Sequence, residues 1–133
     1  MIKKAFRSIF VISMLLALTA CSTMSPVMNI ENQVVPGSLT LQQVKDGIII
    51  GGAQKKWQMT EVKPGVIHGS IILRQHSAKI VIPYSKDSYS INYSSSDNLS
   101  YRNGKIHRNY NKWIILLNET IQKQLRLMSM HSK

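Results

Sequence analysis

Cysteine is almost absent from this sequence, and the single copy, Cys21, excludes an intramolecular disulfide. Carboxylates are scarce too, with six Asp and Glu against 17 Lys and Arg, and their wide separation argues against the paired carboxylates that hydrolyse glycans. There is no Gly-x-Ser-x-Gly elbow for acyl transfer. The four histidines lack metal-ligand spacing. We therefore expect a protein that is not an enzyme and holds neither a metal nor a cofactor.

Long apolar runs are absent beyond the first 20 residues, and that first segment is typical of an export signal. A basic start precedes an apolar run over residues 9–20, which is shorter than the about 20 apolar residues of a permanent membrane helix. The run ends in Leu18-Thr19-Ala20-Cys21. This tetrapeptide resembles the bacterial lipobox, which implies cleavage before Cys21 and attachment of diacylglycerol and a further acyl chain such as palmitate. We predict that Cys21 is the lipidation site.

The residue after the cysteine bears on the membrane that receives the protein. An aspartate there tends to retain such lipoproteins in the inner membrane, and this chain has Ser22. We therefore expect lipid anchoring on the periplasmic face of the outer membrane. The sequence then divides into a signal peptide (1–20), a lipidated N-terminus with a flexible tether (21–38) and one periplasmic α+β domain (39–133). Docking of Val34-Val35 as a short strand is the alternative for the tether.

The charge of the exported part is strongly positive. Three of the basic residues lie in the leader, so fourteen remain against six acidic residues, a formal charge of +8. Such a field favours anionic partners. Because export removes nucleic acid as a partner, we expect the lipid bilayer, bound through acylated Cys21, together with an envelope protein or an anionic envelope component. The alternative is a basic surface that only maintains solubility.

Hydrophobic periodicity predicts a helix, three strands and a second helix. The first helix begins near Thr40, which has capping-box spacing to Gln43, and its glycines weaken it. Alternation predicts strands over 66–75, 78–84 and 88–94, and a stripe of apolar residues predicts a helix over 106–128. The simplest architecture is a three-stranded antiparallel meander with both helices on one face. Its other face, with His68 and the serines of the third strand, is then a plausible contact surface.

Several short motifs between residues 41 and 125 form a larger pattern. They are Lys56-Trp57, Pro64-Gly65, His76-Ser77-Ala78, Ile82-Pro83-Tyr84, Tyr89-Ser90-Ile91-Asn92-Tyr93, Asn98-Leu99-Ser100-Tyr101 and Ile106-His107 with Tyr110-Asn111 and Trp113. Together they resemble a family of small proteobacterial lipoproteins whose role is not established. The resemblance implies the lipoprotein class and one compact domain, and it transfers no activity and no catalytic residue.

The segment between residues 98 and 113 is the main candidate for binding. Tyr101, Arg102, His107 and Arg108 combine an aromatic ring with groups that hydrogen-bond to sugars or phosphates. The alternative is that this segment serves the core and the turn into the second helix. We expect a non-catalytic binding or envelope-accessory module. A periplasmic inhibitor or immunity-type lipoprotein is the alternative, and a cell-wall hydrolase is a third hypothesis.

Overall fold

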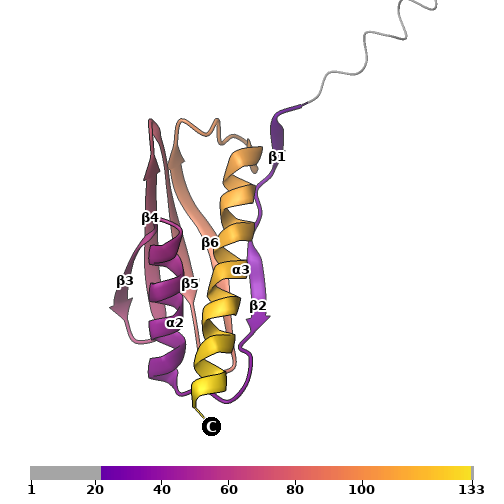
Figure 1. The fold of residues 1–133 in the computed structure, drawn as a ribbon. Coiled ribbons are helices and arrows are strands. Elements are labelled where there is room, and N and C mark those ends of the chain that lie inside the picture. Colours follow the sequence, from indigo (N-terminus) through magenta and orange to yellow (C-terminus); the bar gives the residue numbers. More distant parts are fainter. Residues whose placement is uncertain (1–21, 133) are drawn as a thin grey trace, which may run out of the picture.

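A computed structural model describes residues 22–132, so the export signal and Cys21 lie outside the described residues (Figure 1). The elements are β1 (Met24–Pro26), β2 (Ile30–Val34), α2 (Leu41–Gln54), β3 (Gln58–Lys63), β4 (Val66–Leu73), β5 (His76–Pro83), β6 (Ser88–Asp97), β7 (Lys105–His107) and α3 (Arg108–His131). Neither helix is long and apolar enough to span a membrane within this part of the chain.

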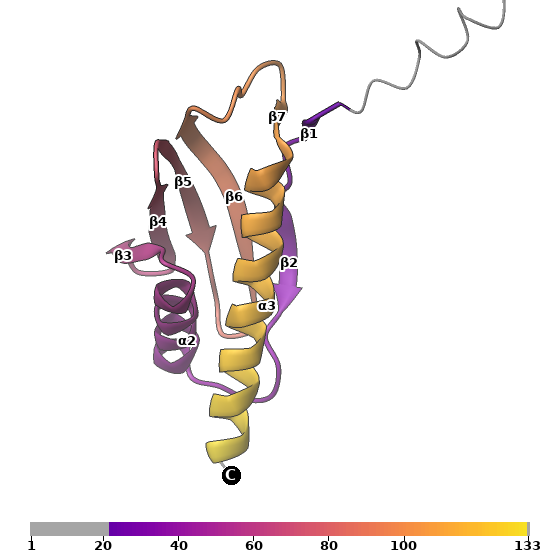
Figure 2. The same cartoon turned by 45° about the horizontal axis from the view of Figure 1, so that its top comes forward.

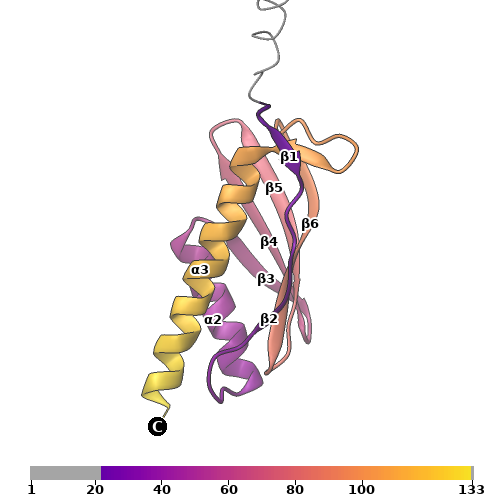
Figure 3. The same ribbon diagram turned by 90° about the vertical axis from the view of Figure 1, so that its right-hand side faces the viewer.

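The main sheet has five antiparallel strands in the order β2-β6-β5-β4-β3, and β1 pairs with β7 in a separate two-stranded ribbon. Both helices lie against one face of the main sheet, as Figure 3 shows from the side. The prediction of a three-stranded meander is therefore wrong. The meander exists as β4, β5 and β6, but β3 extends it on one side and β2 on the other.

Strand β3 was missed because its core-facing positions are not all apolar. Gln58, Thr60 and Lys63 are exposed, while Met59 and Glu61 point toward the helices and are half-buried. A carboxylate at an inward position and a register shift between Glu61 and Lys63 both hide the alternation. The strand nevertheless forms a hairpin with β4 through the Pro64-Gly65 turn, where Gly65 has a φ of +84°.

Residues 22–38 hold two strands instead of a flexible tether. Met24 to Pro26 pair with His107 to Lys105, and Ile30 to Val34 pair with β6. Between the two strands, the Met28 N–H donates to Asn111 Oδ1 at 3.0 Å. The next residue after β2, Val35, is 5% exposed and belongs to the core. The expected alternative, docking of this segment as a strand, describes the structure better than a free linker.

The two helices approach each other closely because α2 presents glycines to α3. A Cβ added to Gly51 would lie 3.0 Å from the Cα of Ile121, and one added to Gly47 would meet the Leu125 side chain at 2.4 Å.

The capping box at Thr40 is confirmed: its hydroxyl accepts from the Gln43 N–H, and the Gln43 side chain accepts from the Thr40 N–H. The helix predicted over 106–128 is confirmed as α3. Its stripe of Tyr110, Ile114, Leu117, Ile121 and Leu125 is fully buried.

Candidate functional site

The structure brings the four predicted binding residues to one end of the molecule, where β1, β7 and the start of α3 meet (Figure 2). Tyr101 is 45% exposed and stacks on Tyr93 with the ring centroids 4.5 Å apart. Arg102 is exposed and pairs with Lys105 through backbone hydrogen bonds in both directions. This tight turn uses Asn103 and Gly104, both with positive φ.

His107 and Arg108 also take part in local structure at this end. The Nδ1 of His107 accepts from the Asn109 N–H at 3.2 Å, so its ring caps α3. The Arg108 N–H donates to the Thr23 carbonyl at 2.9 Å, while its side chain is exposed. Three of the four predicted residues therefore offer free side chains at the surface, whereas His107 is half-buried and serves as a cap.

The sheet face opposite the helices carries a shallow polar hollow of about 270 Å³. The hollow is lined by Gln58, Thr60, His68, Gly69, Ser70, Lys79, Ile80, Val81 and Ser94. A second hollow of about 130 Å³ adjoins it, shares Gln58 and Ser70, and adds Lys56 and Ile72. The linings contain two lysines and no carboxylate. This face, predicted from His68 and the serines of the third strand, is thus polar, hollowed and positively charged.

A third surface feature is an apolar groove of about 300 Å³ between the C-terminal end of α2, the end of β4 and α3. Its lining consists of Gln54, Lys55, Lys56, Trp57, Ile71, Leu73, Trp113 and Leu116. Sequence reasoning missed this groove because its wall is assembled from three separate elements. The two tryptophans in one chain of this size were the only signal.

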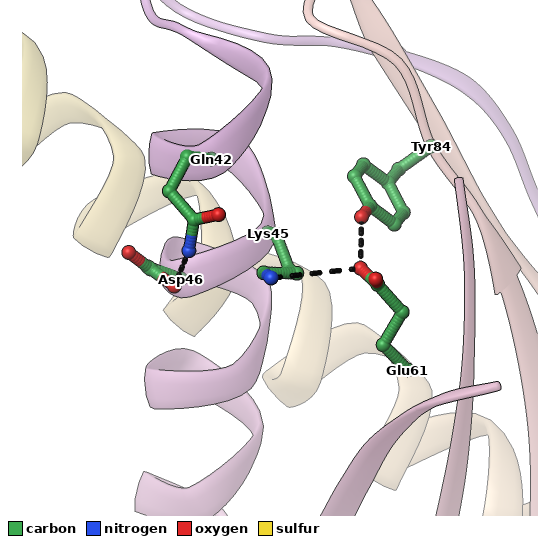
Figure 4. A network of polar contacts seen from close by, with 5 residues as sticks. All are labelled: Gln42, Lys45, Asp46, Glu61 and Tyr84. Atoms are coloured by element: carbon green, nitrogen blue, oxygen red, sulfur yellow. Dashed lines mark hydrogen bonds and ion pairs between the residues drawn. The ribbon is translucent and has the colours of Figure 1, made fainter. Parts of the chain in front are cut away.

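A small polar network joins the start of α2 to β3 and the end of β5 (Figure 4). The Tyr84 hydroxyl donates to Glu61 Oε2, and the Lys45 ammonium lies 3.9 Å from the same oxygen. On α2 itself, Gln42 donates to Asp46 at 2.9 Å. The pocket beside this network encloses only about 120 Å³. The geometry of this network suits a structural link between α2 and the sheet better than a substrate site.

Three buried tyrosines have raised pKa values. Burial, together with the hydrogen bond to Glu61 and its charge, raises the pKa of Tyr84 to about 12. Burial raises the pKa of Tyr89 to about 12, although the hydrogen bond from Gln122 acts in the opposite direction. Burial also raises the pKa of Tyr110 far above its ordinary value, and its hydroxyl has no partner among the described residues. These hydroxyls are held in the neutral form.

These pKa values predict a loss of stability in alkali. The unfolded chain releases tyrosine protons near pH 10, whereas the folded chain keeps those of Tyr84 and Tyr89 to about pH 12, so stability falls as pH rises between these values. Urea unfolding at increasing pH should show a falling midpoint. In the Tyr84→Phe variant the midpoint should fall less steeply with pH. Phenolate absorbance should then show one fewer tyrosine that ionises only near pH 12. Identical slopes for the two proteins would contradict the assignment to Tyr84.

The histidines point to structural roles where their contacts are known. His76 Nδ1 lies 2.7 Å from the Asn98 carbonyl, and His131 Nδ1 lies 2.7 Å from the Leu127 carbonyl. Within residues 22–132, no group of three or more His, Cys, Asp or Glu side chains is placed to hold a metal ion.

Comparison of the chain with models of protein families, with curated proteins and with solved structures gave no match. The resemblance to small lipoproteins stays a prediction.

Proposed function

We propose that this protein is a lipoprotein, anchored through acylated Cys21 to the periplasmic face of the outer membrane, whose domain binds an envelope protein without catalysing a reaction. The observation that carries the binding role is the open face of the five-stranded sheet. Helices cover one face only, and the other face holds two adjoining hollows. The lipobox Leu18-Thr19-Ala20-Cys21 carries the anchoring.

The composition of the open face supports a protein partner with acidic groups. A solvated antiparallel sheet face is ordinary and needs no partner. This face, however, exposes 77% of Ile72 beside the polar hollows, with Lys56 and Lys79 among the lining residues. An apolar side chain flanked by cations and hydroxyl groups matches a surface that combines carboxylates with an apolar anchor. The +8 charge of the exported part adds long-range attraction to such a partner.

Site-specific photo-crosslinking in intact cells tests the binding role. A photoreactive amino acid at His68 or Ser70, on the open face, should give a discrete crosslinked protein. The same group at the exposed Leu127 of α3 is the matched control and should give none. Equal crosslinking from both faces, or none from the open face of a folded protein, would overturn the proposal. Capture of a lytic enzyme or a toxin would instead support the inhibitor or immunity alternative.

The anchoring has its own test. Intact mass spectrometry of the mature protein should show diacylglycerol and an acyl chain on Cys21, and Cys21→Ser should leave the membrane fraction. An unmodified cysteine on the mature chain would overturn the anchoring while leaving the crosslinking result interpretable.

A further inference from the structure

The folded domain begins almost immediately after the predicted lipidation site. Thr23 accepts a hydrogen bond from the Arg108 N–H at 2.9 Å, and Met24 pairs with His107. The Val27 N–H then donates to the Gly104 carbonyl at 2.8 Å. Only Ser22 separates Thr23 from the predicted lipidation site in the sequence, and two steps between successive Cα atoms span at most ~8 Å. A connection this short cannot lift the domain away from a lipid attached at Cys21.

The end of the domain that carries this attachment is rich in exposed cations. We define the anchor-end surface by Arg74 in the β4–β5 turn, Arg102 in the turn before β7, Lys105 at the start of β7, and Arg108 at the start of α3. Figure 2 shows β1, β7, the start of α3 and the loop after β6 at the same end. The Asn98 side chain in that loop donates to the Gln75 carbonyl of the β4–β5 turn at 2.7 Å, which places this turn there too. All four side chains are exposed.

Two neighbours of these cations bear on what the anchor-end surface contacts. A carboxylate, that of Asp97, lies at the end of β6, where it accepts a hydrogen bond from the Ser77 hydroxyl at 3.3 Å. Tyr101, which precedes Arg102 in the chain and is 45% exposed, presents a ring with a polar tip that is stacked on Tyr93. An amphipathic aromatic ring among cations is typical of side chains at the level of lipid headgroups.

We infer that the anchor-end surface lies directly on the anionic phospholipid headgroups of the membrane that holds the protein, with the arginines and Lys105 binding their phosphates. This inference rests on the proposed acylation of Cys21, which brings that end to the bilayer. It assigns anionic phospholipid headgroups as the ligand of the predicted binding residues Tyr101, Arg102 and Arg108. Strands β4 and β6 end and β5 starts at this end, so the open sheet face stands upright from the membrane and is accessible from the side.

The test separates the position of the cations from the total charge. The probe protein is the mature chain without lipid, residues 22–133, which keeps every contact described above. One variant, R74Q/R102Q/K105Q/R108Q, removes the anchor-end cations. The control, K63Q/K86Q/K123Q/R126Q, removes four exposed cations from the end of β3, the β5–β6 turn and the second half of α3. Both variants lose the same formal charge.

Binding is measured by sedimentation with vesicles of phosphatidylglycerol and phosphatidylethanolamine, and with vesicles of phosphatidylcholine alone. Each cation near an anionic surface contributes about fivefold in affinity, so the anchor-end variant should bind the anionic vesicles at least ~50-fold more weakly than the parent. The control should lose less than about fivefold, and added salt should weaken binding by the parent. Urea unfolding checks that both variants are folded.

Two results would overturn the inference: no binding of the parent to anionic vesicles, or equal losses in the two variants. The mass of Cys21 distinguishes this failure from failure of the anchoring. An acylated cysteine with equal losses in both variants refutes the membrane contact alone. An unmodified cysteine with a selective loss refutes the anchoring and keeps the lipid-binding surface.

Discussion

Replacing Gly51 with valine is expected to destabilise the domain by about 3 kcal/mol or more, because the two helices can no longer reach their native separation. A Cβ at this position would lie 3.0 Å from the Cα of Ile121 and 3.2 Å from its backbone nitrogen. Backbone atoms cannot move aside as the end of a flexible side chain can. The helices would have to separate, and buried residues such as Ile48 and Leu117 would lose their packing.

The matched control is Ala53→Val on the same helix. Ala53 is exposed, so this variant introduces the same β-branched side chain without the contact to α3. It loses about half a kcal/mol of helix propensity, whereas Gly51→Val gains a few tenths, so propensity alone would make Gly51→Val the more stable of the two. Equilibrium urea unfolding of the two variants and the parent measures the difference. For a domain with a total stability of about 5 to 10 kcal/mol, Gly51→Val should lower the midpoint by roughly a third or more. Midpoints of the two variants that coincide would show that the close approach contributes nothing.

The glycines of α2 illustrate what a sequence can and cannot reveal. Propensity identifies Gly47, Gly51 and Gly52 as weak points of a helix, and that reasoning is correct for an isolated helix. The structure shows that they are the contact points with α3 and β3 instead. The capping box at Thr40 was predictable because its two hydrogen bonds join residues only three positions apart. The helix–helix contact joins residues about 70 positions apart, and no local pattern encodes it.

The strands of the main sheet also divide into those that the sequence predicts and those that it does not. Strands β4, β5 and β6 were predictable because their core-facing residues are apolar and alternate regularly. Strand β2 was not, because it is an edge strand with a bulge, and Asn32 has a φ of 49°. Its pairing with β6 joins residues nearly 60 positions apart. Strand β3 has Glu61 at a core-facing position, where Tyr84 and Lys45 satisfy the carboxylate. Only the assembled fold makes that residue acceptable there.

The candidate surfaces follow the same physical reasoning. Tyr101, Arg102 and Arg108 could be named as candidates because their chemistry is conspicuous and they are close in sequence. Arg74 was missed, since it joins them only through the length of β4 and β5. The apolar groove was missed because its shape depends on where α2 ends relative to β4 and α3. Chemistry that is local in the chain can be predicted, whereas a surface assembled from distant elements requires the fold.

Deleting residues 22–34 is expected to cost at least about 3 kcal/mol of stability and to cause the domain to associate. The deletion removes β1 and β2, together with the half-buried Val27, Met28 and Ile30 that pack against the core. It also removes the hydrogen bond that Asn29 Oδ1 accepts from the Tyr93 N–H at 2.9 Å. A flexible tether would make none of these contacts, and its removal would leave stability unchanged.

Association follows from the exposure of β6. Without β2, residues 88–91 of this strand become an unprotected sheet edge whose free N–H and C=O groups can pair with another chain. Urea unfolding and sedimentation velocity at several concentrations measure the two effects. The control replaces residues 22–34 with a Gly-Ser segment of equal length, which restores the chain length but not the side chains of β2. If that control matches the parent in both measurements, side-chain packing by β2 is dispensable. If it matches the deletion, the side chains of residues 22–34 are part of the folded domain.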